Sequence, residues 1–139
     1  MAGAIVTSVA KLKAGVTRYE VTWVSDVAGD VNGSTFLMKQ GTILAVEFVP
    51  SVGALTPDAG YDVDLLDANS ISLFDDGAGT SIGVNLSATL STHHVPLNGQ
   101  TGITVYRRWQ QGGAVQLTVA GAGDTNAGTV DIFVLDTVT

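Results

Sequence analysis

The chain has 139 residues, no cysteine and a formal net charge of −7. This length corresponds to one domain with its own hydrophobic core, and the absence of cysteine excludes disulfide bonds and thiolate zinc sites. The acidic balance argues against nucleic acid as a partner, because a surface that binds phosphates must be basic. No apolar run is long enough to cross a bilayer, so we expect no membrane partner either.

Charged residues make up only 14% of the chain, against about a quarter in a typical soluble protein. Lysine and glutamate, the types that protein interfaces avoid, are especially rare. This composition favours a protein that associates with itself or docks on a partner over a plain monomer.

The first 17 residues are predicted to form an N-terminal arm or a first edge strand, ahead of a β-domain over 18–139. Lys11, Lys13 and Arg18 precede the first acidic residue, Glu20. This basic segment is suited to an acidic partner surface, although ordinary solvated lysines on a first strand explain it equally well.

Apolar residues recur at every second position in short segments separated by turns rich in Gly, Asp, Asn and Pro, which is typical of β-strands. The predicted strands lie near 18–24, 42–49, 61–66, 70–74, 82–88, 92–97, 102–106, 115–120 and 129–135. They predict an all-β, single-domain antiparallel β-sandwich or jelly-roll-like barrel. Two longer loops, 25–35 and 121–128, are expected to make contacts.

The alternation also predicts which side chains face the core. In 18–24 the core side carries Tyr19, Val21 and Trp23. In 42–49 we expect Leu44, Val46 and Phe48 to face the core, which leaves Glu47 on the other side.

Phe133 falls on the nominally solvated face of the last strand. This position indicates that a second sheet or a neighbouring subunit covers that face.

Candidate metal ligands are few. His93 and His94 are adjacent in a strand and point to opposite faces, so they cannot readily share an ion. Carboxylates of Asp62 and Asp64, with Asp67, Asp75 and Asp76 in the following turns, predict an acidic rim. Calcium would suit such a rim, but no EF-hand spacing is present, and acidic turns are common. We therefore expect no metal and no cofactor.

No motif for catalysis or for nucleotide binding is apparent. The chain lacks a Gly-x-Ser-x-Gly elbow for a serine nucleophile. Its glycine-rich stretches at 77–83 and 121–123 lead into strands, whereas a phosphate-binding loop opens a helix. We therefore expect no enzymatic activity and no small-molecule ligand.

The segment Arg107-Arg108-Trp109 breaks the alternation that begins at Ile103, so a strand is expected to bulge or end there. Trp109 has two alternative roles. It is either exposed beside the guanidinium groups, as a sugar platform or an interface anchor, or folded into the core with its indole N–H bonded to a carbonyl.

Five short sequence segments, taken in their order along the chain, resemble small virion structural proteins of tailed bacteriophages. They are Thr22-Trp-Val-Ser-Asp26, Val46-Glu-Phe-Val-Pro50, Tyr61-Asp-Val-Asp-Leu-Leu-Asp67, Gly83-Val-Asn-Leu-Ser87 and Gly128-Thr-Val-Asp-Ile-Phe-Val134, and together they span most of the β-domain. The resemblance is to capsid decoration, or cement, proteins, which bind the outside of the phage head.

The resemblance implies that the chain stabilises the lattice of the major capsid protein and acts as a dimer or trimer. It also implies synthesis in the host cytoplasm and a final place on the outer capsid surface of the virion. The expected interface residues are Lys11, Lys13, Arg18, Arg107, Arg108, Trp109 and Phe133. One alternative is a tail or head-fibre protein that binds host glycans, and another is a separate carbohydrate-binding module.

Overall fold

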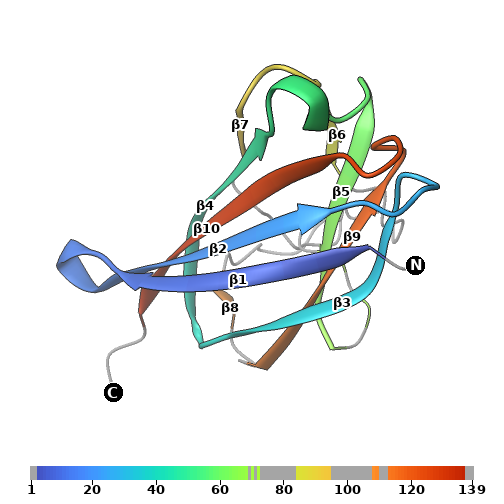
Figure 1. Ribbon diagram of the computed structural model, residues 1–139. Helices are drawn as coiled ribbons and strands as arrows, with labels where there is room; N and C mark the ends of the chain where they lie inside the picture. Colours follow the sequence, from blue (N-terminus) through green and yellow to red (C-terminus); the bar gives the residue numbers. More distant parts are fainter. Residues whose placement is uncertain are drawn as a thin grey trace, which may run out of the picture.

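The computed structural model describes residues 3–68, 70, 72, 84–94, 108–109 and 113–136. Two antiparallel β-sheets pack face to face, with almost no helix (Figure 1). The prediction of an all-β sandwich is therefore confirmed.

Among the described residues, six strands form the larger sheet and four form the smaller one. The larger sheet has the order β1 (Ala4–Lys11), β2 (Val16–Val24), β10 (Ala127–Asp136), β4 (Gly41–Pro50) and β7 (Thr92–His94), and β8 (Arg108–Trp109) also pairs with β4. The smaller sheet has the order β3 (Val31–Met38), β9 (Gly113–Ala120), β5 (Tyr61–Leu66) and β6 (Val84–Leu86). Short 3-10 turns lie at Lys13–Gly15 and Gly53–Leu55.

The core lies between the two sheets and follows the predicted alternation. Tyr19, Val21 and Trp23 of β2 are buried, as expected from the sequence. Trp23 also contacts Tyr61 of the smaller sheet, with ring centroids 5.7 Å apart. This aromatic pair joins the two layers across the core.

The predicted core face of β4 is wrong at one position. Phe133 pairs with Ala45, but the next residue of β10, Val134, pairs with Ile43, so the pairing skips Leu44. This irregularity places Ile43 in the core at 2% exposure and leaves Leu44 at 37%. One extra residue in a strand reverses the side to which the following side chains point.

One strand follows one of the two alternatives predicted for its segment, and another lies where the sequence predicted a loop. Residues 4–11 form β1, which pairs with β2 through a tight turn in which Ala14 and Gly15 have positive φ. The predicted loop 25–35 is wrong in its second half, because β3 begins at Val31.

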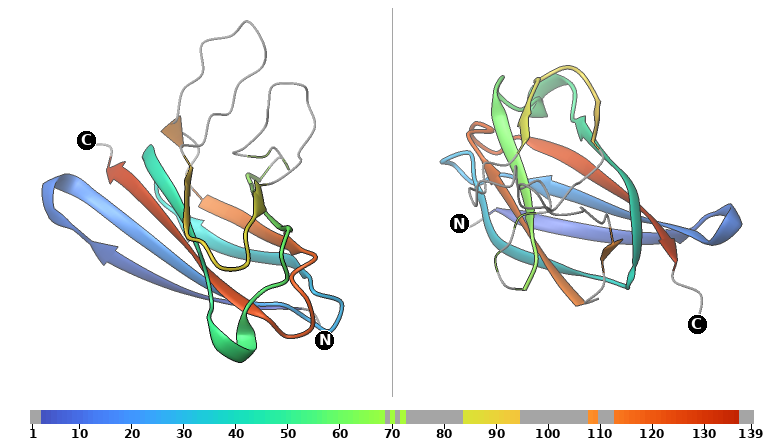
Figure 2. Two further views of the ribbon diagram at one scale, coloured as in Figure 1. Left: turned by 90° about the horizontal axis from the view of Figure 1, so that it is seen from above. Right: turned by 180° about the vertical axis from the view of Figure 1, so that it is seen from behind.

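The hairpin of β1 and β2 reaches beyond the rest of the described strands (Figure 2). β1 is the outermost strand of its sheet, and its side chains Val6 and Val9 are 72% and 57% exposed. Of the two descriptions expected for the N-terminal segment, the edge strand is the one that residues 4–11 follow.

Candidate interaction surfaces

A row of acidic side chains crosses the outer face of the larger sheet. Asp131 of β10 lies directly opposite Glu20 of β2 and Glu47 of β4. Directly opposed residues of neighbouring strands point to the same face, and here that face is the one turned away from the core. All three side chains are half-buried, because each strand has a neighbour on both sides.

Electrostatic repulsion within this row falls mainly on Asp131. Burial raises the pKa of its carboxyl, and the carboxylates of Glu20 and Glu47 raise it further, against the opposing effect of Arg18. Oδ1 of Asp131 is buried and accepts no hydrogen bond from any described residue. Within the described part of the chain, the centre of this face thus carries a buried acceptor that no donor meets.

Phe133 lies next to this row and directly opposite Arg18, with Ala45 on its other side. It is half-buried on the outer face, the position predicted from its alternation. The Arg18 guanidinium leans instead toward Glu20, with Nη2 3.8 Å from Oε2. Two of the predicted interface residues, Arg18 and Phe133, are therefore neighbours.

Apart from Arg18, the described remainder of this outer face is largely uncharged. Thr22 and Thr129 lie opposite each other with their hydroxyl oxygens 3.5 Å apart, and Val49 follows on β4. A strip of methyl and hydroxyl groups beside one row of carboxylates is suited to docking on a protein.

The tip of the β1–β2 hairpin carries Lys11 and Lys13, two more of the predicted interface residues. Nζ of Lys11 donates to Thr17 Oγ1 at 2.8 Å and to Asp136 Oδ2 at 3.0 Å. The hydrogen bond from Thr17 lowers the pKa of Asp136, and that from Lys11 lowers it further. Lys11 is thus held against β10, while Lys13 lies exposed in the turn.

The opposite end of the sandwich is acidic. Loop 25–30 and loop 121–126 bond to each other there: Ser25 Oγ donates to the carbonyl of Gly123 at 2.7 Å, and the backbone N–H of Gly121 donates to Asp30 Oδ1 at 3.3 Å. Asp58 joins them through its N–H, which donates to the carbonyl of Ala122.

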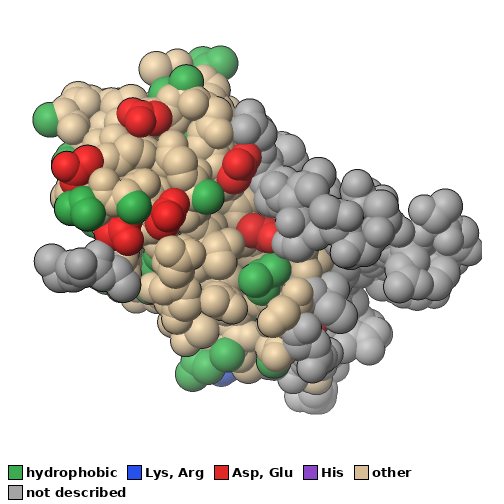
Figure 3. Space-filling model, turned by 90° about the vertical axis from the view of Figure 1, so that its right-hand side faces the viewer, with side chains coloured by type: hydrophobic (Ala, Val, Ile, Leu, Met, Phe, Trp, Pro, Cys, Tyr) green, Lys and Arg blue, Asp and Glu red, His purple; other side chains and the backbone are tan. Residues whose placement is uncertain are grey.

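Asp26 stabilises this end from within its loop. Its Oδ1 accepts the N–H groups of Asp30 and Ala28, and the bond from Asp30 does most to lower the pKa of Asp26. Figure 3 shows several carboxylates gathered on this side of the molecule and almost no lysine or arginine.

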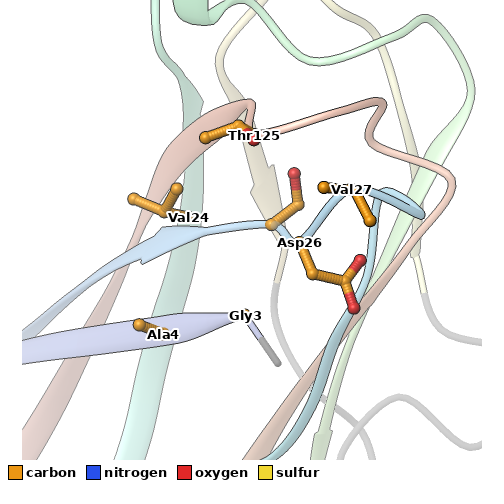
Figure 4. Close-up of a pocket in the computed structure, with 7 residues that line it drawn as sticks. Gly3, Ala4, Val24, Asp26, Val27 and Thr125 are labelled. Carbon is orange, nitrogen blue, oxygen red and sulfur yellow. The ribbon is translucent and has the colours of Figure 1, made fainter. Parts of the chain in front are cut away.

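A shallow hollow of about 210 Å³ lies beside loop 25–30, at the start of β1. Figure 4 shows Ala4 and Val24 on adjacent strands, with Val27 and Thr125 at the loop end. The lining residues are Gly3, Ala4, Val24, Ser25, Asp26, Val27 and Thr125. A site of this size is smaller than a typical small-molecule pocket of about 300–1,000 Å³, but it is large enough for one side chain.

Several predicted residues are placed only in part. Arg107 lies outside the described residues, and Arg108 and Trp109 are described only through the backbone of β8, which pairs with Thr42 and Gly41. Both alternatives for Trp109 therefore stay predictions. His93 and His94 lie in β7, opposite Glu47 and Val46.

The predicted acidic rim is wrong for Asp64. Asp64 is 8% exposed, and its Oδ1 accepts hydrogen bonds from Leu65 N–H and the Ser72 hydroxyl. Asp75 and Asp76 lie outside the described residues. Among the residues that are described, no three His, Cys, Asp or Glu side chains are grouped to hold a metal ion.

The sequence did not predict the acidic row on the larger sheet or the acidic end of the sandwich. The acidic end forms from loops 25–30 and 121–126, which are far apart in the chain, and no local sequence pattern indicates that they meet.

Within the described ranges, no helix has the length and apolarity needed to span a membrane. Comparison of the chain with protein-family models, curated proteins and solved structures finds no match to any of them.

Proposed function

We propose that the protein is a capsid decoration protein of a tailed phage, which binds the major capsid protein through the outer face of the larger sheet. The proposal starts from the five sequence segments whose order along the chain resembles that in such proteins. The observation that carries it in the structure is the outer face itself, where Phe133 and a strip of threonine and valine lie beside half-buried carboxylates.

The apolar part of this face supplies contact area. Side chains of central strands are already ordered by their neighbours, so little further conformational entropy is lost when a partner covers them. The strip of Thr22, Thr129 and Val49 contains no charged side chain, which favours close packing, and both glutamates of the chain, Glu20 and Glu47, lie in the acidic row beside it.

The acidic row supplies specificity. Among the described residues no donor meets the buried Oδ1 of Asp131, and a partner that places a lysine, arginine or backbone N–H against the accessible part of this half-buried carboxylate offsets its charge. A partner without such a donor leaves the carboxylate buried and unpaired, which is strongly unfavourable. The capsid site is therefore expected to present a donor opposite Asp131.

The test uses phage heads assembled without the protein, mixed with the purified chain and imaged by cryo-electron microscopy. We expect regularly spaced density on the outer shell and heads that survive greater heat. Bare shells contradict the proposal. Bare shells together with density on tails or binding to a glycan array support the tail or head-fibre alternative.

A matched pair of variants identifies the docking face. Thr22 and Thr35 are both exposed strand residues, on the outer faces of the larger and smaller sheet respectively. Thr22→Arg is expected to weaken head binding by about tenfold or more, because it introduces a bulky charge into the interface. Thr35→Arg is expected to bind as the unmodified protein does, and equal losses in both variants contradict the assignment of the face.

A further inference from the structure

The free edge of β1 has hydrogen-bonding groups that no described strand uses. β1 is hydrogen-bonded to β2 on one side and to no described strand on the other, and β3 of the smaller sheet lies near its start. At the end of this pairing, the Leu12 N–H donates to the Val16 carbonyl at 2.7 Å. Because backbone groups alternate in direction along an antiparallel strand, those of Ile5, Thr7 and Val9 point to the free side.

This edge lacks the features that usually prevent strand pairing. Residues 3–10 include no charged residue and no proline, and most side chains of β1 are exposed. Soluble proteins normally protect a long edge strand with charges, proline or a covering loop. An unprotected edge of this length is suited to the addition of another strand.

We propose that β1 pairs antiparallel with β1 of a second copy, about a two-fold axis beside Ser8. The extended backbone continues from Ala4 to Leu12, whose φ and ψ are −97° and −176°. An axis at Ser8 uses this whole length, since it places Leu12 of one copy opposite Ala4 of the other. The two larger sheets become one continuous sheet.

The charges at the two ends of β1 favour a second copy in this orientation. One end leads to the exposed Lys13, and the other lies beside the acidic loop that contains Asp26 and Asp30. Antiparallel pairing brings the basic end of each copy to the acidic end of the other, twice in one dimer. Parallel pairing would bring like charges together.

The hollow at the start of β1 provides a matching apolar contact. Leu12 is 42% exposed at the hairpin tip. In the proposed register Leu12 lies opposite Ala4, which lines the hollow together with Val24 and Val27 (Figure 4). The hollow therefore receives Leu12 of the second copy, and Lys13 follows it toward Asp26.

This inference depends on β1 and the two ends of the sandwich, not on the capsid. A dimer can form whether or not the protein binds phage heads, so the two proposals succeed or fail separately.

The first test measures mass in solution by sedimentation equilibrium, with Val6→Lys and Val52→Lys as matched variants. Both valines are exposed, but Val6 lies in the middle of β1 and Val52 lies beyond β4. We expect the unmodified protein and Val52→Lys to be dimers, and Val6→Lys to dissociate at least about tenfold more readily. Monomers at all concentrations, or equal dimerisation of both variants, overturn the proposal.

The second test fixes the register in a chain that has no native cysteine. Ser8 would lie opposite Ser8 of the second copy in a non-hydrogen-bonded pair, with Cα atoms about 4.5 Å apart, which is within reach of a disulfide. Under mild oxidation Ser8→Cys is expected to form a covalent dimer far faster than the exposed control Val52→Cys. Equal rates exclude this register.

A charge exchange tests the contact between the ends. Lys13→Glu alone and Val27→Lys alone are each expected to weaken the dimer, because each places like charges together. The double variant is expected to recover much of the lost affinity, and the recovery should diminish with added salt. A double variant weaker than either single variant contradicts the antiparallel arrangement.

Discussion

Gly128 of β10 lies directly opposite Trp23 of β2, and the indole fills the space that a side chain at position 128 would occupy. A Cβ atom built on Gly128 would lie 2.6 Å from Cζ2 of the indole. Trp23 is almost fully buried and contacts Tyr61 on its other side, so the ring cannot move away without disturbing the core.

Gly128→Ala is therefore expected to destabilise the fold by about 1–3 kcal/mol, the usual range for an overpacked core. Urea denaturation monitored by tryptophan fluorescence measures the loss. Thr129→Ala, at the adjacent outer-face position, is the control and should change stability much less. An unchanged midpoint for Gly128→Ala contradicts the close contact.

Asp131→Asn is expected to stabilise the protein at pH 7. The folded-state pKa of Asp131 is raised, so the folded chain holds this proton more tightly than the unfolded chain does. The free energy of unfolding therefore decreases as the pH rises from the pKa of Asp131 in the unfolded chain to its higher pKa in the folded chain. Above the folded-state pKa the protein stays destabilised by this amount. Removal of the charge relieves two opposed like-charged pairs, each worth about 0.2–1 kcal/mol.

Thermal unfolding of both proteins at pH 7 and pH 3 measures this effect. The difference between them should shrink at pH 3, where Asp131 is protonated. A difference that is the same at both values contradicts the electrostatic cause.

Thr17→Val is expected to weaken the attachment of the β1–β2 hairpin to β10. The buried Thr17 hydroxyl donates to Asp136 and accepts from Lys11, and valine keeps the shape but removes both bonds. The folded pKa of Asp136 is lowered, so its contribution is present above the unfolded pKa and disappears as the pH falls through the folded one.

We expect a melting temperature a few degrees lower at pH 7 and faster amide exchange in the hairpin. The difference should decrease in acid. Unchanged exchange in residues 4–17 contradicts the role of this cluster.

Ser25→Ala is expected to loosen the acidic end. Ser25 is buried, and its hydroxyl donates to the Gly123 carbonyl while accepting the Asn126 N–H at 3.0 Å. Its removal takes a partner from the part-buried Gly123 carbonyl and Asn126 N–H, at about 1–3 kcal/mol. Hydrogen exchange should increase first in loop 121–126, whereas Thr35→Ala on the exposed face of β3 should leave that loop unchanged.

The strands that the sequence predicted well have one buried face and one wet face. In β2, β9 and β10 this contrast produces a clear alternation. β1 gives no such signal, because it is exposed on both sides and buries little. β3 was missed for another reason: Asn32 and Gly33 read as a turn, and the structure has a register shift there, with Gly33 at φ +75°.

The interaction surfaces could not be predicted from local sequence patterns, because they depend on which strands are neighbours in the sheet. Alternation placed Phe133 and Glu47 away from the core, as the structure shows. The acidic row, however, depends on β10 lying between β2 and β4, which brings together residues 20, 47 and 131. Only strand order determines which outer side chains become neighbours.

The central place of β10 in the larger sheet also affects how the chain matures. β10 leaves the ribosome after both strands that it joins, so β2 and β4 have exposed inner edges throughout earlier synthesis. Such edges invite pairing with other chains. The larger sheet therefore closes only after translation has passed residue 136, the last residue of β10.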